Sequence, residues 1–297
     1  MSAEVGYESK VVEEIRKAMA AYIPNECAQT ASELQSIWLK AKPLESTPLI
    51  RQEAREKLKA IGTPVPVLKA IGKEIGKAAK KWVNDFLPLI RLLWDEYGRE
   101  GRIVAATALH PMELAEPSNV IPFVRELART SISWEDCDQL AMEALEPIVR
   151  KRPEEYLAPL EPWVRDENKW VRRAGITVIG RLPMKRGEYT ARCLEMVEPA
   201  LGDPDRDVRR AVSFAIRMGA RGDPAAVRTF IEKHALSTDP NVIWVMCDVV
   251  RSMTRKFLPE FEPLLSLYER WAADPTLSAK DRRSVESAVK TLRSIQR

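Results

Sequence analysis

The sequence predicts an all-α protein, a HEAT-like helical-repeat solenoid with a concave basic groove. Three observations predict this fold class. Alternating β-branched runs typical of strands are nearly absent, helical apolar spacing runs through most of the 297 residues, and similar segments recur every 36 to 37 residues. Because a single helical hairpin cannot bury its own apolar face, neighbouring hairpins are expected to stack into an array.

Apolar periodicity, helix caps and the positions of proline and glycine predict the individual helices. The whole chain, 1–297, is predicted to form one solenoid, with N-terminal helices or a cap at 1–45, repeats at 46–275 and a C-terminal capping helix at 276–297. We expect helices at 9–22, 46–60, 66–81, 84–97, 101–109, 119–130, 134–150, 154–164, 169–181, 188–201, 206–218, 223–235, 241–254, 258–272 and 278–296.

Internal repetition sets the period of the array. Asp166, Asp203 and Asp239 lie 37 and 36 residues apart, each in a short turn that precedes a helix, and Trp134 precedes Trp170 by 36 residues. This period fits HEAT-like repeats better than the 33 or 34 residues of ankyrin and tetratricopeptide arrays. In such arrays the second helix of each hairpin commonly lines the concave side, so we expect the second helices to form the groove.

Composition and motif content exclude several classes of protein. The chain is 45% hydrophobic and 30% charged, as folded globular proteins are, and it has no apolar run long enough to span a bilayer. The N-terminal segment lacks the apolar core of a signal peptide, so we expect a cytoplasmic protein. Four scattered cysteines, two histidines and the absence of a glycine-rich phosphate loop predict no metal site and no nucleotide cofactor.

Basic residues are concentrated in two segments, although the net charge of the chain is only +4. Residues 65–81 carry five Lys and one Glu, and residues 165–222 carry thirteen Lys and Arg and eight acids. Within the first segment Lys69, Lys73, Lys77 and Lys81 recur every four residues, which places them in one row along a helix. The row is either a solvated face or a stripe that follows DNA phosphates.

Further cations recur on the predicted second helices. Arg173 and Arg210 are 37 residues apart, so they should occupy equivalent positions in adjacent repeats, and Lys169 and Arg172 lie beside Arg173. A guanidinium fork suits phosphate oxygens, and an Arg-lined groove fits a duplex backbone. Alternatively, these cations connect one repeat to the next through carboxylates. Those carboxylates are Asp203, Asp205 and Asp207.

The segment SISWEDCDQLAMEAL holds the candidate chemistry. Ser133 and Asp136 form the S-x-x-D pattern of a capping box, which predicts a helix that starts at Trp134. Asp138 lies beyond the first turn and four residues from Trp134, so an indole and a carboxylate should project from the same face. The alternative is a core Trp beside a solvated Asp.

The other tryptophans and both histidines are interpreted as structural. His110 precedes a proline at the end of an apolar run, and His234 ends a helical segment. We expect core positions for the remaining tryptophans because of their size and spacing. These are Trp38, Trp82, Trp94, Trp163, Trp170, Trp244 and Trp271.

Four segments in order resemble one known family. They are AIGTPVPVLKAIGKEIGK, LIRLLWDEYGREGRIVAATAL, SWEDCD with its W-x-x-x-D pattern, and ENKWVRRAGI with its N-x-W-x-x-R pattern. Together they cover about residues 55–220 and resemble the AlkD-type DNA alkylation repair glycosylases, which are built from HEAT-like repeats. The resemblance implies that Trp134 is an active-site Trp, Asp138 the catalytic Asp and Arg173 an active-site Arg. Phe214 stands where the family has a second cleft Trp.

The resemblance also implies a function. It predicts a monofunctional DNA glycosylase that hydrolyses the N-glycosidic bond of N3- or N7-alkylated purines in duplex DNA. The alkylated purine is already cationic, so one carboxylate should suffice, without an acid, a metal or a cofactor. The predicted DNA contacts are Phe214, Arg172, Arg210, Lys169, Lys69, Lys73 and Lys77.

Two alternatives stay open at this point. Phe214 in place of the larger indole favours a non-catalytic HEAT-like DNA-binding protein, and the repeats alone would suit a protein-interaction solenoid. We expect a monomer, because no heptad seam is present, and a nucleoid-associated protein when it is bound to DNA.

Overall fold

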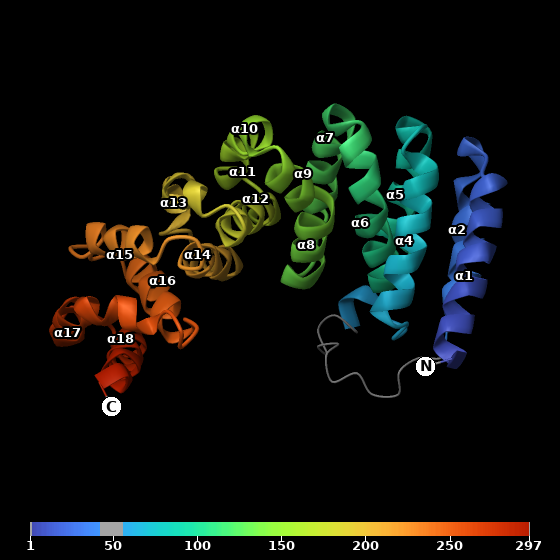
Figure 1. Cartoon of the computed structure of the whole chain (residues 1–297). Coiled ribbons are helices and arrows are strands. Elements are labelled where there is room, and N and C mark those ends of the chain that lie inside the picture. Colours follow the sequence, from blue (N-terminus) through green and yellow to red (C-terminus); the bar gives the residue numbers. More distant parts are fainter. Residues whose placement is uncertain (1, 42–55, 297) are drawn as a thin grey trace. The chain divides into compact units, whose positions relative to one another are not determined.

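The structure is a computed structural model that describes residues 2–41 and 56–296. These residues form helices and turns, with no strand among them (Figure 1), as the predicted all-α class requires. Most of the helix expected at 46–60 lies outside the described residues, although 56–58 are helical. None of the described helices is both long and apolar enough to cross a membrane.

The chain divides into two compact units, Met1–Ile148 (unit 1) and Val149–Arg297 (unit 2). The division falls within the short helix α9, Glu146–Lys151. Both units consist of stacked helical pairs, so the repeat architecture is found within each. The prediction of one solenoid over 1–297, with its boundaries at 45 and 275, stays a prediction.

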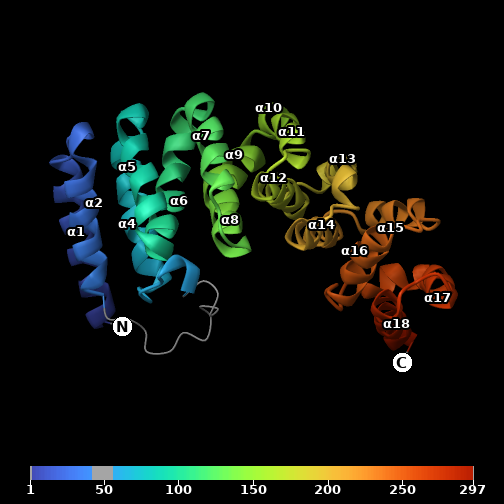
Figure 2. The same ribbon diagram turned by 180° about the vertical axis from the view of Figure 1, so that it is seen from behind.

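Unit 1 is a two-layer stack of helices. One layer holds α1, α4, α6 and α8, and the other holds α2, α5 and α7 (Figures 1 and 2). The bounds are α1 Ser2–Ala20, α2 Cys27–Leu39, α4 Val65–Ala79, α5 Val83–Glu96, α6 Gly98–Ala115, α7 Pro117–Arg129 and α8 Trp134–Leu140, followed by a π-helical turn at Ala141–Leu145.

Glycines bring α4 and α6 close together. A Cβ atom on Gly76 would lie 2.4 Å from the backbone oxygen of Ala108 and 2.8 Å from the ring of Pro111, so only glycine fits this position. On the same helix Leu68, Ile71 and Ile75, spaced by three and four residues, are fully buried. The close approach therefore packs α4 tightly against α6, and α8 packs against α6.

Unit 2 also has two layers. One layer holds α12, α14, α16 and α18, and the other holds α11, α13, α15 and α17. The bounds are α10 Pro153–Tyr156, α11 Glu161–Val164, α12 Lys169–Arg181, α13 Thr190–Val197, α14 Arg206–Gly219, α15 Pro224–Lys233, α16 Pro240–Arg251, α17 Leu265–Ala273 and α18 Ala279–Arg293.

The second helices of successive pairs start at similar spacing. They begin at Trp134, Lys169, Arg206 and Pro240, which are 35, 37 and 34 residues apart. Asp239 is the N-cap of α16, whereas Asp203 lies two residues before the N-cap of α14. The aspartates of the repeat are 37 and 36 residues apart, but they do not occupy the same position relative to the helix start. Their spacing therefore gives the spacing of the helix starts only approximately.

Prolines shorten the first helices of unit 2. The expected continuous helix at 154–164 is instead α10, a 3-10 turn at Ala158–Leu160 and α11, because Pro159 and Pro162 cannot donate backbone hydrogen bonds. The helix expected at 258–272 likewise starts as a 3-10 helix, Leu258–Leu264, before α17. The helix expected at 188–201 is reduced to α13 between two 3-10 turns.

Two helices of unit 1 also differ from the expected ones. The helix predicted at 101–109 extends over Gly98–Ala115 and continues through Pro111, because Met112 beyond the proline is fully buried and its packing favours continuation. The helix α2, Cys27–Leu39, was not predicted as a separate element. It buries Ala31, Leu34 and Trp38.

Most tryptophans lie in the core, but one does not. Trp82 is 65% exposed at the turn between α4 and α5, so its predicted core position is wrong. Trp244 is half-buried on α16. The remaining ones predicted for the core are buried, namely Trp38, Trp94, Trp163, Trp170 and Trp271.

Candidate functional site

The start of α8 is fixed by the predicted capping box. Ser133 is extended and accepts a hydrogen bond from the amide of Asp136, while Asp136 Oδ1 accepts from the amide of Ser133 at 2.8 Å and from its hydroxyl at 2.6 Å. Backbone amides at a helix start that would otherwise lack partners are thereby satisfied. The first residue of the helix, Trp134, is therefore held at a defined position.

The carboxylate of Asp136 is also the partner of a buried guanidinium. Its Oδ2 atom accepts from the amide of Ile132 at 3.0 Å and from Nη1 of Arg102 on α6. Arg102 donates in addition to the carbonyl of Thr130 at 3.2 and 3.3 Å, and its guanidinium lies 4.6 Å from the centre of the Trp94 ring. The start of α8 is thus joined to α6 and to the turn before α8.

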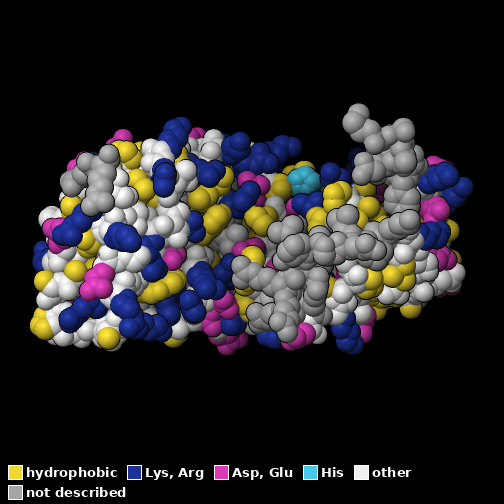
Figure 3. All heavy atoms as spheres, turned by 90° about the horizontal axis from the view of Figure 1, so that it is seen from below, with side chains coloured by type: hydrophobic (Ala, Val, Ile, Leu, Met, Phe, Trp, Pro, Cys, Tyr) yellow, Lys and Arg dark blue, Asp and Glu magenta, His cyan; other side chains and the backbone are white. Residues whose placement is uncertain are grey.

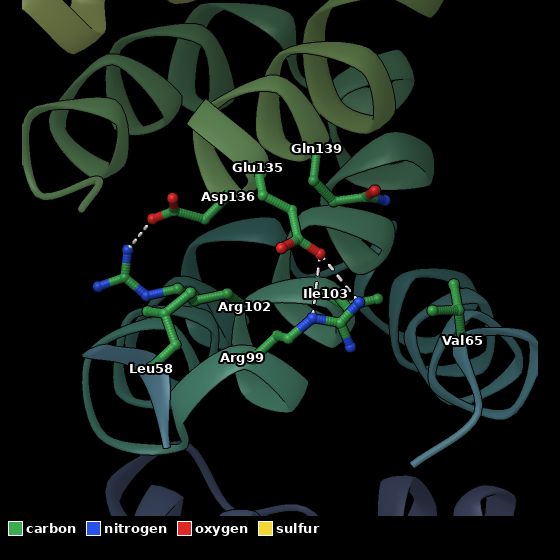
Figure 4. A pocket seen from close by; sticks show the side chains of 8 residues that line it. All are labelled: Leu58, Val65, Arg99, Arg102, Ile103, Glu135, Asp136 and Gln139. Carbon is green, nitrogen blue, oxygen red and sulfur yellow. Dashed lines mark hydrogen bonds and ion pairs between the residues drawn. The ribbon is translucent and has the colours of Figure 1, made fainter. Parts of the chain in front are cut away.

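Three polar side chains of α8 and the following turn face the α4–α6 layer. Glu135 pairs with Arg99 at 2.9 Å, and Glu143 pairs with Lys69 of α4 at 2.7 Å. Between them, Gln139 lines a cavity of about 40 Å³ together with Arg99 (Figure 4). We call Glu135, Gln139 and Glu143 the polar stripe of α8. Its ion pairs join α8 and the following turn to α6 and α4, the helices before it in the same layer.

Trp134 and Asp138 lie on the neighbouring face of α8. An α-helix turns by about 100° per residue. Trp134 is therefore rotated by about 100° from Glu135, and Asp138 by the same angle from Gln139, around the helix axis. Both side chains are half-buried. The structure therefore brings the predicted indole and carboxylate together on one helix, one turn apart, with both partly open to solvent.

A π-helical turn follows directly. At Ala141–Leu145 the helix widens, and the amide of Glu146 donates to the carbonyl of Ala141, five residues earlier. Such turns are rare and often lie near functional sites. The helix expected at 134–150 is therefore interrupted just after the turn that carries Asp138.

In unit 2, side-chain caps fix the starts of α12 and α14. Asn168 accepts from the amides of Trp170 at 2.9 Å and Val171 at 3.3 Å, and Asp205 accepts from the amide of Asp207 at 2.8 Å. Because Asn and Asp are favoured N-caps, the local sequence determines where these two helices begin. The predicted cations Lys169, Arg172 and Arg173 all lie in the first five residues of α12.

Arg172 connects one repeat to the next. Its guanidinium forms a fork on the carboxylate of Asp203, with distances of 2.7 and 3.1 Å. It also donates to the backbone carbonyls six and five residues earlier at 2.8 and 2.9 Å. Arg209, one repeat later, donates to the carbonyls at the same two offsets. For Arg172 the structure shows the contact proposed as the alternative to phosphate binding.

Lys169 makes the same kind of connection. Its amine lies 3.0 Å from Asp205 and 3.4 Å from Asp207, and 4.4 Å from the centre of the Trp170 ring. Burial lowers the pKa of Lys169, but the hydrogen bonds and charges of the two aspartates outweigh this and raise it. Lys169 is therefore a charged link between the start of α12 and the start of α14.

Arg173 and Arg210 differ, although they are one repeat apart. Arg173 is only 6% exposed and donates to the backbone carbonyl of Asp207. Arg210 is exposed, and among the described residues no carboxylate forms an ion pair with it. Of the predicted cations in unit 2, Arg210 is the one most open to an external phosphate. The role of Arg173 that the resemblance implies stays a prediction.

Phe214 is half-buried on α14, two turns after the start of the helix. The guanidinium of Arg217 lies 5.9 Å from the centre of its ring. Burial lowers the pKa of Arg217, and the charge of Asp248 offsets this effect only in part. The neighbouring Ser213 donates to Asp248 at 2.7 Å, which joins α14 to α16. Phe214 thus has a partly open ring beside a cation.

The layer of second helices in unit 2 is rich in basic side chains. In Figure 1 this layer lies below the first helices, and Figure 3 views the molecule from below. Lys and Arg side chains are spread over the visible face of unit 2, with hydrophobic atoms between them. This distribution suits contact with a polyanion.

The lysine row of α4 divides in the same way. Lys69 pairs with Glu143, and Lys77 pairs with Glu74 at 2.5 Å, which is also held by Arg16 at 2.9 Å. Burial raises the pKa of Glu74, but these cations outweigh it and lower the value. Lys73 is exposed and forms no ion pair with any described residue. Of the three lysines of the row that lie on α4, Lys73 is therefore the one most open to an external anion.

Cysteine and histidine are side chains that often bind transition metals in proteins. Cys193 and Cys247 are buried, and burial raises the pKa of each thiol to about 12. His234 lies 3.1 Å from Glu198. In the part of the chain that the structure describes, no three or more His, Cys, Asp or Glu side chains form a group that could hold a metal ion.

The partner of Asp136 was not predicted from the sequence. Arg102 is 34 residues earlier on another helix, and no local pattern connects the two. A signal was nonetheless present, because Arg102 lies in LIRLLWDEYGREGRIVAATAL, one of the segments that carried the resemblance. An Arg within an otherwise apolar helix needs a buried acceptor, and the capping Asp136 was a candidate.

Comparison with known proteins identifies one family. The family model described as DNA alkylation repair enzyme matches residues 44–243. No curated protein matches the chain in sequence. Similar solved structures include an engineered protein with 12% identity, a TM-score of 0.33 and coverage of 82% of this chain and 98% of that chain.

Two designed armadillo repeat proteins are also similar. The first has 15% identity, a TM-score of 0.28 and coverage of 80% of this chain and 98% of that chain. The second, in complex with the peptide (KR)4, has 15% identity, a TM-score of 0.31 and coverage of 94% and 98%.

Proposed function

Because the chain belongs to the DNA alkylation repair enzyme family, whose model matches more than half of it, we propose that it is a monofunctional DNA glycosylase. Its substrates would be N3- and N7-alkylated purines in duplex DNA. The observation that carries this proposal is the placement of Trp134 and Asp138 one turn apart on α8. Arg99 and Arg102 pair with Glu135 and Asp136, and Asp138 is half-buried on the neighbouring face of the same helix.

The chemistry of the substrate fits a single carboxylate. In an alkylated purine the base already carries a positive charge, so the N-glycosidic bond breaks with its electron pair moving onto the base, which becomes neutral. Asp138 would stabilise the cationic sugar that remains and orient the water whose oxygen bonds to C1′. The proton released by that water passes to the carboxylate or to solvent. The reaction needs no acid on the leaving group, no metal and no cofactor.

Aromatic and basic side chains would hold the DNA. Trp134 and Phe214 would pack against deoxyribose and backbone, where an aromatic face also favours a developing cation. Lys73 and Arg210 are the most suitable phosphate contacts, since both are exposed and neither pairs with a described carboxylate. The enzyme would act as a monomer in the cytoplasm, associated with the nucleoid when bound to DNA.

One observation favours a second candidate function. Phe214 offers a smaller ring than the indole that the resemblance implies at this position, and Lys169, Arg172 and Arg173 have protein partners. A chain of this kind could bind DNA without acting on it.

A base-release assay distinguishes the candidates. Duplex DNA methylated at N7 and N3 of its purines is incubated with the protein, and released bases are identified by mass. We expect methylated purines to appear as free bases while normal bases stay in the duplex. Binding with a steep salt dependence but no base release would identify the non-catalytic DNA-binding protein. No DNA binding at all would identify a protein-interaction solenoid.

A further inference from the structure

The guanidinium of Arg102 is buried in a complete set of contacts. Its side chain is 9% exposed and that of Asp136 is 2% exposed. The guanidinium lies against the Trp94 ring and donates to the Thr130 carbonyl as well as to Asp136. The Trp94 indole in turn donates to the Thr130 hydroxyl at 2.9 Å. Contacts with Trp94 and Thr130 therefore fix the position of the guanidinium, which also pairs with Asp136 of α8.

The acceptor is equally well satisfied. Asp136 accepts from the amides of Ile132 and Ser133, from the Ser133 hydroxyl and from Arg102. A buried carboxylate with four donors is fixed in orientation. Because two of these donors are backbone amides, the carboxylate also fixes the backbone conformation of residues 132–136. Without Arg102, the same carboxylate would be a buried charge with no cation beside it.

This contact acts on the part of α8 that bears the candidate site. Trp134 lies between Ser133 and Asp136, and Asp138 is two residues beyond Asp136. The ion pair of Arg99 with Glu135 joins the same two helices, but Glu135 is 28% exposed and bonds to no helix-start amide. Figure 4 shows both acids directed from α8 toward their Arg partners. Arg102 thus couples α6 directly to the capping box.

We propose that Arg102 is a positioning residue for Asp138. Its ion pair with Asp136 sets the start and rotation of α8, and thereby the direction in which the Asp138 carboxylate and the Trp134 indole meet the substrate. This inference rests on the proposed glycosylase function. A purely structural role would affect stability, whereas a positioning role affects the chemical step even when stability is restored.

The test uses the full chain and the variants Arg102→Met, Arg102→Lys and Arg102→Met combined with Asp136→Asn. Single-turnover release of 7-methylguanine, affinity for undamaged duplex DNA, melting temperature and hydrogen exchange of the α8 amides are measured. Arg99→Met is the matched control, because it removes the more exposed ion pair between the same helices.

We expect Arg102→Met to lower the single-turnover rate at least tenfold, to change DNA affinity less than twofold, and to speed exchange at residues 132–138. The double variant removes the unpaired buried charge, so it should regain melting temperature but not rate. Arg102→Lys can still pair with Asp136 but has fewer directed donors, and it should recover part of the rate. Arg99→Met should lower the rate less than threefold.

Three results would overturn the positioning role. They are recovery of the rate together with the melting temperature in the double variant, an equal loss of rate in Arg99→Met, and unchanged α8 exchange in Arg102→Met. Failure of the glycosylase function would appear differently, as no base release by the unmodified protein. The exchange measurement still judges the role of Arg102 in that case, because it does not depend on activity.

Discussion

The start of α8 in unit 1 and the starts of α12 and α14 in unit 2 use charged side chains in opposite ways. At α8, two cations of the neighbouring helix α6 engage Glu135 and Asp136, and α8 presents Asp138 and Trp134 on its neighbouring face. At α12, the helix supplies the cations itself, and Lys169 and Arg172 engage the aspartates before and within α14.

The difference shows that residue type alone does not separate a binding surface from a repeat connection. Arg172 and Arg210 are both Arg on second helices of unit 2, yet one is forked on Asp203 and the other is exposed. An Arg that lies within reach of the aspartates before the next second helix connects two repeats, whereas an Arg outside that reach is open to an external phosphate. We therefore expect chemistry from unit 1 and, in unit 2, phosphate contacts only from cations beyond the reach of those aspartates.

The largest effect is expected at Asp138. Asp138→Asn should lower the rate of methylpurine release by about 100-fold or more, equivalent to about 3 kcal/mol of transition-state stabilisation, because the neutral amide cannot balance a cationic sugar. DNA affinity should be nearly unchanged. Single-turnover kinetics and a binding titration measure the two quantities. Glu135→Gln, on the same helix, is the control, and undiminished release by Asp138→Asn would remove the proposed role of this carboxylate.

The next effect is on the stability of unit 2. Arg172→Met should lower the free energy of unfolding by about 3 kcal/mol, because Asp203 is then a buried carboxylate without its cation. Chemical denaturation followed by circular dichroism measures the loss. Arg210→Met, which changes an exposed Arg on the next second helix, should alter stability little. Unchanged stability of Arg172→Met together with weaker DNA binding would place Arg172 at the DNA instead.

A smaller effect separates Arg210 from Arg173 in DNA binding. Arg210→Ala should reduce the slope of log affinity against log salt by about one, as expected for one lost phosphate contact, with stability unchanged. Arg173→Ala should mainly lower stability, because Arg173 is buried and donates to the Asp207 carbonyl. Titrations at several salt concentrations give both slopes. A flatter slope for Arg173→Ala at unchanged stability would support the phosphate contact that the resemblance implies.

The smallest effect concerns pH. Burial raises the pKa of Asp205, but the hydrogen bonds from Lys169 and from the Asp207 amide outweigh it and hold the pKa below its usual value. The stabilisation is therefore present above about pH 4, the usual value for an unfolded Asp, and is lost as the pH falls below it. Asp205→Asn keeps an N-cap side chain but loses the charge, at a cost of under about 1 kcal/mol.

Denaturation at pH 3 and pH 7 tests this expectation. The variant and the unmodified protein should differ at pH 7, and the difference should be smaller at pH 3. A difference that persists unchanged at pH 3 would show that the cap, rather than the charge pair with Lys169, accounts for the stabilisation.

Local patterns predicted much of the fold and part of the candidate site. The capping box of Ser133 and Asp136 is confirmed, because both partners lie within four residues of each other and their geometry follows from the helix start. Helical spacing likewise predicted α4 and α14 closely. The proline-interrupted helix at 154–164 was mispredicted, because apolar spacing alone does not show how each proline redirects its hydrogen bonds.

Long-range partners could not be predicted in the same way. Arg102 and Asp136 are 34 residues apart, and Lys69 and Glu143 are 74 apart, so only the packing of α4, α6 and α8 brings them together. For the same reason the sequence left two roles open for Lys169 and Arg172. The exposure of Trp82 was missed because a large indole at the end of an amphipathic helix gives no local sign of which side it faces.

The π-helical turn at Ala141–Leu145 sets the rotational phase between the two ends of one long helix. Removing a single residue from it would turn the downstream part by about 100°, and Glu143 would no longer point toward Lys69. Substitutions in this turn change one side chain, whereas a one-residue deletion changes the direction of every side chain after it. The length of this short segment is therefore under tighter constraint than its composition.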